Sequence, residues 1–208
     1  MTRLMLLGAV LLLMVWSGNA PAADEANVDV FRSAAAQIEL HKPTGWHFQG
    51  MERALANRAE VELSDEEFQK AMHRNAALPL VVATKHAEPY DSLNPSVQVI
   101  ARPAGPLKGA SPTEILGQVE PAFKRQFADY TSLDGIRETS IGGERAARMT
   151  FRYTARTGDG GEFPTRVTMV MVLRGSLVYQ FGFSAPPTGS DALADEVEAV
   201  LRSVKFLN

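Results

Sequence analysis

Histidines and nearby carboxylates are the residues of this chain best suited to acid–base or metal chemistry. The four histidines are His41, His47, His73 and His86. No two stand at the HxH or HxxxH spacing that presents paired imidazoles to one metal ion. His41 and His47 flank one turn, and Glu88 and Asp91 follow His86 in one loop, so either group could hold zinc, manganese or calcium. Scattered residues of these types are usually solvated surface groups, and we adopt that interpretation.

Nucleophilic catalysis has little support in the sequence. The absence of cysteine removes thiol nucleophiles, thiolate metal sites and disulfides. The G-x-S-x-G elbow of serine hydrolases is also absent, and Ser176 follows Gly175 in a segment typical of a tight turn. Residues 158–162 are glycine-rich but lack the features of a calcium loop or a phosphate loop, so we interpret them as a hairpin turn. A hydrolase stays the alternative, because the histidines leave a general base available.

A row of arginines is the candidate binding surface. Arg148, Arg152 and Arg156 recur at every fourth residue of one strand-like segment, and Arg166 has the matching parity on the next. Alternate residues of a strand point to the same side, so these four should share one face. Such a face could contact an acidic partner, a lipid headgroup or another anionic surface. The alternatives are a merely solubilising face, or a face covered by the last helix, in which case the arginines must be paired.

The length and composition of the chain fit one globular domain. The chain has 208 residues, of which 45% are apolar and 22% are charged, as is ordinary for a protein that buries a core. The formal net charge is −3. We therefore expect no nucleic-acid partner, because phosphate binding depends on clustered lysine and arginine.

The first 22 residues are expected to form a signal peptide. Arg3 gives a positive start, residues 4–16 are almost continuously apolar, and Ala20-Pro21-Ala22 has the small-x-small pattern of a cleavage site. The apolar run is shorter than the roughly 20 residues that span a bilayer, so we expect cleavage after Ala22 and no transmembrane segment afterwards. An uncleaved anchor is the alternative. The protein would be periplasmic or secreted, where nucleotide cofactors are not available, and we expect no cofactor.

The C-terminal half has the clearest secondary-structure pattern. Apolar and polar residues alternate over 147–155, which predicts a strand with one buried and one wet face. Further strands are expected over 165–173 and 177–185, with turns at 158–161 and 175–176. Three consecutive strands joined by tight turns form an antiparallel meander.

Two helices are expected to flank this meander. A capping box with proline at the first helical position starts a helix over residues 111–127. A last helix runs over residues 190–204 with an apolar stripe that must lie on the sheet. We expect it to pack across the centre of the sheet, marked by Phe151, Met169 and Phe181.

The N-terminal half gives weaker signals. Residues 23–36 are expected to form a polar, alanine-rich and partly helical lead-in to a single domain over residues 37–208. Within that domain we expect a strand, two helices and two more strands, over 36–41, 51–58, 64–74, 78–86 and 97–102 respectively.

This order of elements resembles the PsbP-like fold family. The motifs that carry the resemblance are Pro43-x-Gly45-Trp46, the Gly142-Gly143 turn and the closing Ser203-x-x-Phe206. The resemblance implies an α+β fold, in which helices flank an antiparallel β-sheet as an α/β/α sandwich, shared by small exported bacterial proteins. It also implies a non-enzymatic binding or accessory role, and it fixes no ligand. The loop over residues 89–95 does not map onto the family pattern.

Two function classes follow. The favoured one is an exported accessory or binding protein of the cell envelope that uses surface contacts with an unknown envelope protein or an anionic surface. The other is a small hydrolase or metal-dependent enzyme that uses histidine and carboxylate residues. An enzyme requires His41 or His86 to converge with carboxylates in a deep cleft, whereas a binding protein can use a shallow surface.

Overall fold

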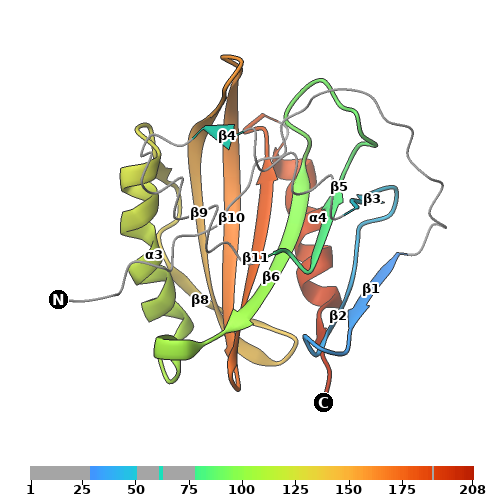
Figure 1. Ribbon diagram of the computed structural model, residues 1–208, viewed down its shortest axis with the longest axis vertical. Helices are drawn as coiled ribbons and strands as arrows, with labels where there is room; N and C mark the ends of the chain where they lie inside the picture. Colours follow the sequence, from blue (N-terminus) through green and yellow to red (C-terminus); the bar gives the residue numbers. More distant parts are fainter. Residues whose placement is uncertain (1–28, 51–60, 63–77, 189) are drawn as a thin grey trace.

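The computed structural model describes the part of the chain that contains the sheet and its flanking helices. The described residues are 29–50, 61–62, 78–188 and 190–208 (Figure 1). The expected signal peptide over residues 1–22 and the expected helices over 51–58 and 64–74 lie outside them. Within the described ranges, no helix has both the length and the apolar character needed to cross a membrane.

A large antiparallel sheet forms the middle layer. Among the described residues it has nine strands, in the order β3-β5-β6-β11-β10-β9-β4, with β7 and β8 also paired to β9 (Figure 1). The strands are β3 (His47–Phe48), β4 (Val61–Glu62), β5 (Val81–Thr84), β6 (Ser96–Pro103), β7 (Thr131–Ser132), β8 (Arg137–Ile141), β9 (Glu144–Thr157), β10 (Glu162–Arg174) and β11 (Leu177–Ala185). The meander β9-β10-β11 confirms the prediction for the C-terminal half.

A second, three-stranded sheet joins the two ends of the described chain. Its order is β1-β2-β12, with β1 (Val30–Ser33), β2 (Ile38–His41) and β12 (Lys205–Phe206). The expectation of partial helix over residues 23–36 is wrong for Val30–Ser33, because these residues pair with β2 instead. The buried ammonium of Lys42 lies 2.6 Å from the Asp29 carboxylate and holds this segment in place.

Two helices cover opposite faces of the large sheet. Helix α3 (Pro112–Gln126) packs on β9 and β10, whereas α4 (Ser190–Ser203) lies on the other side together with β2 (Figure 1). A short 3₁₀ turn, η1 (Gly105–Leu107), precedes α3. The fold is therefore an α+β sandwich with an antiparallel sheet between helical layers, as the sequence predicts.

Each face of the sheet has its own hydrophobic core. Phe151 and Met169 belong to the core under α3, whereas Phe181 belongs to the core under α4. The last helix packs across the strands that carry these residues, as expected, but the side chains of Phe151 and Met169 belong to the opposite face. The physical reason is that both faces of the central strands are buried, so that alternation separates the faces but does not say which helix covers each.

The start of α3 offers a first test of the fold. Ser111 Oγ accepts a hydrogen bond from the Glu114 backbone N–H at 3.2 Å, and the Glu114 carboxylate accepts one from the Ser111 N–H at 2.7 Å. We expect Ser111→Ala to lower the free energy of unfolding by about 1 kcal/mol in urea titrations, because it removes the cap. The exposed Gln118→Ala on the same helix is the control, and an equal loss there would contradict the capping argument.

The same contacts give the cap a pH dependence. Hydrogen bonds from the Ser111 backbone and side chain hold the pKa of Glu114 below its usual value. A lowered pKa in the folded state means that the stabilisation is present at neutral pH and is lost as the pH falls through that pKa. The difference between the wild type and Ser111→Ala should therefore shrink in acid.

Candidate functional site

The four arginines of the predicted row lie on adjacent strands β9 and β10 and share one face. Arg152 faces Arg166 directly across the two strands, and Arg156 faces Glu162 in the same way. Arg148 is four residues before Arg152 on β9, and its side chain reaches α4. We call Arg148, Arg152, Arg156 and Arg166 the basic face, which lies on the α4 side of the sheet.

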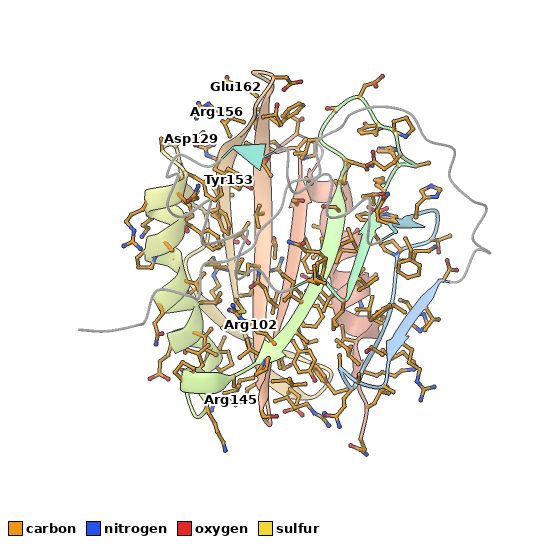
Figure 2. The ribbon with its side chains drawn as sticks, in the orientation of Figure 1. Arg102, Asp129, Arg145, Tyr153, Arg156 and Glu162 are labelled. Carbon is orange, nitrogen blue, oxygen red and sulfur yellow. The ribbon has the colours of Figure 1, made fainter. Side chains whose placement is uncertain are left out.

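Two arginines of the basic face are held in ion pairs at its two ends. Arg148 is half-buried and donates a hydrogen bond to the carboxylate of Glu198 on α4. At the far end, Arg156 Nε lies 2.9 Å from the Glu162 carboxylate, and both side chains are exposed (Figure 2). The expectation of a wet face is therefore wrong at the Arg148 end, since α4 covers it and pairs its cation.

The middle of the basic face carries two facing cations. Arg152 is exposed, and no ion-pair partner for it lies in the described ranges; Arg166 is half-buried. Guanidinium groups form strong, charge-assisted hydrogen bonds with carboxylates and phosphates. This part of the face is therefore the part best suited to contact an anionic partner.

A small pocket opens beside these arginines, between α4 and the sheet. Its volume is about 50 Å³. Its lining includes Trp46, Arg148, Arg166, Thr168, Phe183 and Leu193. We call this the α4 pocket; the sequence patterns did not reveal it, because its walls come from segments far apart along the chain.

Trp46 lines the α4 pocket. It follows the turn at Gly45, and its backbone N–H donates to the Pro43 carbonyl at 3.1 Å. The side chain is only 4% exposed, and its indole Nε1, which is itself buried, has no hydrogen-bond partner among the described residues. A buried donor without an acceptor costs roughly 1–3 kcal/mol.

Comparison with known proteins identifies the fold. No protein-family model matches the chain, and no curated protein sequence matches it significantly. LpqN of Mycobacterium tuberculosis, a protein involved in cell envelope biogenesis, is 12% identical with a TM-score of 0.52, over 82% of this chain and 83% of LpqN. Cyanobacterial PsbP (CyanoP) of Synechocystis sp. PCC 6803 is 12% identical with a TM-score of 0.51, over 91% of this chain and 98% of CyanoP. The chain has a PsbP-like fold.

The three described histidines of this PsbP-like fold lie on separate segments. His41 ends β2 and His47 begins β3, and both are exposed; His73 lies outside the described residues. The ring of His86 stacks on Tyr90, with ring centroids 4.4 Å apart. In the described ranges, no group of three or more histidine, aspartate or glutamate side chains is placed to hold a metal ion.

The loop after β5 is organised by Asn94 within the PsbP-like fold. The Asn94 side chain accepts a hydrogen bond from the His86 N–H at 3.0 Å and donates to the Glu88 carboxylate at 2.9 Å. The backbone of Lys85 also donates to the Pro95 carbonyl at 2.8 Å. The Glu88 carboxylate thus helps to hold the loop together through its hydrogen bond with Asn94.

The glycine-rich run between β9 and β10 is a hairpin turn, as the sequence predicts. Its backbone closes through a hydrogen bond from the Thr157 N–H to the Gly161 carbonyl at 3.1 Å. The Asp159 carboxylate accepts hydrogen bonds from Thr157 and from the Gly161 N–H, and these hold its pKa below the usual value. Ser176 likewise lies in the turn between β10 and β11. Both segments have the structural roles that their sequences indicate.

Two further polar groups of the PsbP-like fold were not singled out by the sequence. Arg102 at the end of β6 is half-buried, and burial lowers its pKa, while its Nη2 lacks a partner among the described residues. The Tyr153 hydroxyl is also buried and also lacks a partner among the described residues. Its burial, and to a smaller extent the charge of the nearby Asp129 carboxylate, raises its pKa (Figure 2). The alternation of a strand predicts on which face each of these residues lies, but it does not predict whether the polar group has a hydrogen-bond partner.

Proposed function

We propose that this protein is an exported accessory protein of the cell envelope that binds an acidic partner or an anionic surface through the basic face. The observation that carries the proposal is the facing pair Arg152 and Arg166, two cations on adjacent strands. Arg148 and Arg156 extend the positive charge to both sides, although each already has an acidic neighbour. A surface of this kind recognises carboxylates or phosphates and attracts them over a distance.

Two further points support the envelope location. The segment over residues 1–22 has the order of a signal peptide, which would deliver a single folded domain to the periplasm or the exterior. LpqN, a structural relative, is a protein of cell envelope biogenesis. A metal-dependent enzyme or hydrolase would need His41 or His86 beside carboxylates in a deep cleft, and we have no observation that favours it.

The proposal is tested by charge reversal on the basic face. Arg152→Glu should lower partner recovery at least about tenfold after crosslinking in intact cells and pull-down, because the reversal removes one cation and adds one anion, each worth roughly 1 kcal/mol near an anionic surface. The affinity of the wild type should also fall as salt is raised, since exposed charges are screened within about 8–10 Å. The expected mechanism is loss of electrostatic attraction, with no change in fold.

Arg145→Glu is the matched control. Arg145 is exposed on the same strand β9 but lies at the opposite end of the sheet from Arg156 (Figure 2). It should leave partner recovery unchanged. Equal losses for Arg145→Glu and Arg152→Glu, or recovery that does not respond to salt, would contradict a specific role for the basic face.

A further inference from the structure

We infer that the first half of α4 is a lid held by ion pairs, and that Arg148 becomes available to an anionic partner only when this lid opens. The lid comprises residues 193–199 of α4. The inference rests on the proposed function, because it concerns access to the basic face. It goes beyond that proposal by giving the acidic residues of α4 a role in controlling the contact.

Two ion pairs connect the lid to the rest of the described protein. Glu198 accepts a hydrogen bond from Arg148 on β9. Both oxygens of the Glu196 carboxylate lie within 3.1 Å of the ammonium of Lys85, in the loop after β5. The four side chains are between 28% and 41% exposed. Ion pairs that reach solvent are screened by salt and contribute little to stability, so these two pairs break at little cost.

The apolar contacts of α4 are concentrated in its second half. Val200 and Leu201 are buried in the core between α4 and the sheet. Leu193 and Val197, which belong to the lid, are only half-buried. The second half of the helix is therefore anchored by hydrophobic burial, whereas the lid depends more on its ion pairs.

The lid is also incompletely packed on the sheet. The α4 pocket lies beneath it, and the residues of α4 that line this pocket are Leu193, Ala194 and Val197, all in the lid. The volume of about 50 Å³ exceeds the roughly 10–15 Å³ that one water molecule needs. A gap of this size removes packing contacts, and segments with few buried contacts are those that open locally.

Opening of the lid completes the basic face. Arg148 lies four residues before Arg152 on β9 and on the same side of the sheet. While the lid is closed, the carboxylate of Glu198 neutralises Arg148. A carboxylate or phosphate of the partner competes with Glu198 for the same guanidinium group, which forms charge-assisted hydrogen bonds with either. The partner therefore binds the open form more tightly, and its apparent affinity depends on the fraction of molecules in which the lid is open.

Hydrogen exchange tests the opening of the lid. In the full-length wild-type protein, the amides of residues 194–199 should exchange at least about tenfold faster than the amide of Val170, which is completely buried on β10. Low urea concentrations should change this exchange little, because local opening exposes little new surface. Glu198→Gln should accelerate it roughly two- to fivefold, since it breaks one partly exposed ion pair. Lid amides that exchange as slowly as Val170, with the same urea dependence, would overturn the inference.

Partner recovery tests whether the lid controls the basic face. After crosslinking in intact cells and pull-down, Glu198→Gln should raise recovery at least about twofold, because it frees Arg148. Asp195→Asn removes the same charge from an exposed position of the lid that has no ion-pair partner in the described part of the chain, so it should leave exchange and recovery unchanged. An equal rise for Asp195→Asn, or no rise for Glu198→Gln, would contradict control by the lid. If Arg152→Glu still lowered recovery in that case, the proposed function would stand without the lid.

Discussion

Phe181→Ala is expected to lower the free energy of unfolding by about 3–5 kcal/mol, the range typical of truncating a buried aromatic side chain. Phe181 lies in the middle of β11 and is completely buried in the core under α4. Its register partners are Val170 on β10 and Val99 on β6, so the lost ring leaves a cavity bounded by two strands and the helix. Urea unfolding followed by circular dichroism measures the change.

Arg152→Ala provides the contrast for this measurement. Arg152 lies on β9, which β10 separates from β11 in the same sheet, but its side chain is exposed. Removal of an exposed charge changes the free energy of unfolding by well under about 1 kcal/mol. A loss at Arg152→Ala as large as the loss at Phe181→Ala would show that the two side chains do not differ in burial as described. The same pair of variants separates stability from binding, because only Arg152 belongs to the basic face.

Gly142→Ala is expected to destabilise the protein by about 2–5 kcal/mol. A Cβ atom at Gly142 would lie 2.9 Å from the Phe206 ring and 3.0 Å from the Val204 carbonyl oxygen, closer than real contacts allow. The residue also has a φ of +56°, which costs a non-glycine residue roughly 1–2 kcal/mol. Crowding adds about 1–3 kcal/mol, because the backbone around Val204 must move. Thermal and urea unfolding both report the loss.

The adjacent Gly143 separates these two contributions. It also has a positive φ, +83°, but a Cβ there would meet no atom within 4 Å. Gly143→Ala should therefore cost only about 1–2 kcal/mol, through the backbone conformation alone. If the two substitutions cost the same, the close approach of the C-terminal segment to the Gly142-Gly143 turn would be contradicted.

The sequence predicted those strands and helix ends that depend on residues close together in the chain. The alternation of apolar residues located the meander, and β11 spans Leu177–Ala185 as expected. The capping box at Ser111 correctly began α3, because the cap is formed by residues three positions apart. The order of these elements was enough to recognise the PsbP-like fold, which the structural comparisons confirm.

Features that depend on distant segments could not be predicted in this way. The α4 pocket combines Trp46, Arg166 and Leu193, which belong to three elements that no local pattern connects. The pairing of Arg148 with Glu198 likewise depends on which face α4 covers, and both faces of the sheet are apolar enough to be covered. Strand β1 was missed because its four residues pair only with β2 and have no strong alternation of their own.

The small sheet can form completely only when the C-terminal end of the chain is present. Strand β12 pairs with β2, and the Lys205 ammonium contacts the Glu39 carboxylate at 3.1 Å across 166 residues of sequence. During synthesis from the N-terminus, β2 is made long before its partner exists, and its apolar side chains Ile38 and Leu40 belong to the core that α4 completes. This half of the protein can therefore close only when the last helix and strand are available to the folding chain. A nascent chain that stops before Lys205 leaves one edge of β2 without its native partner strand.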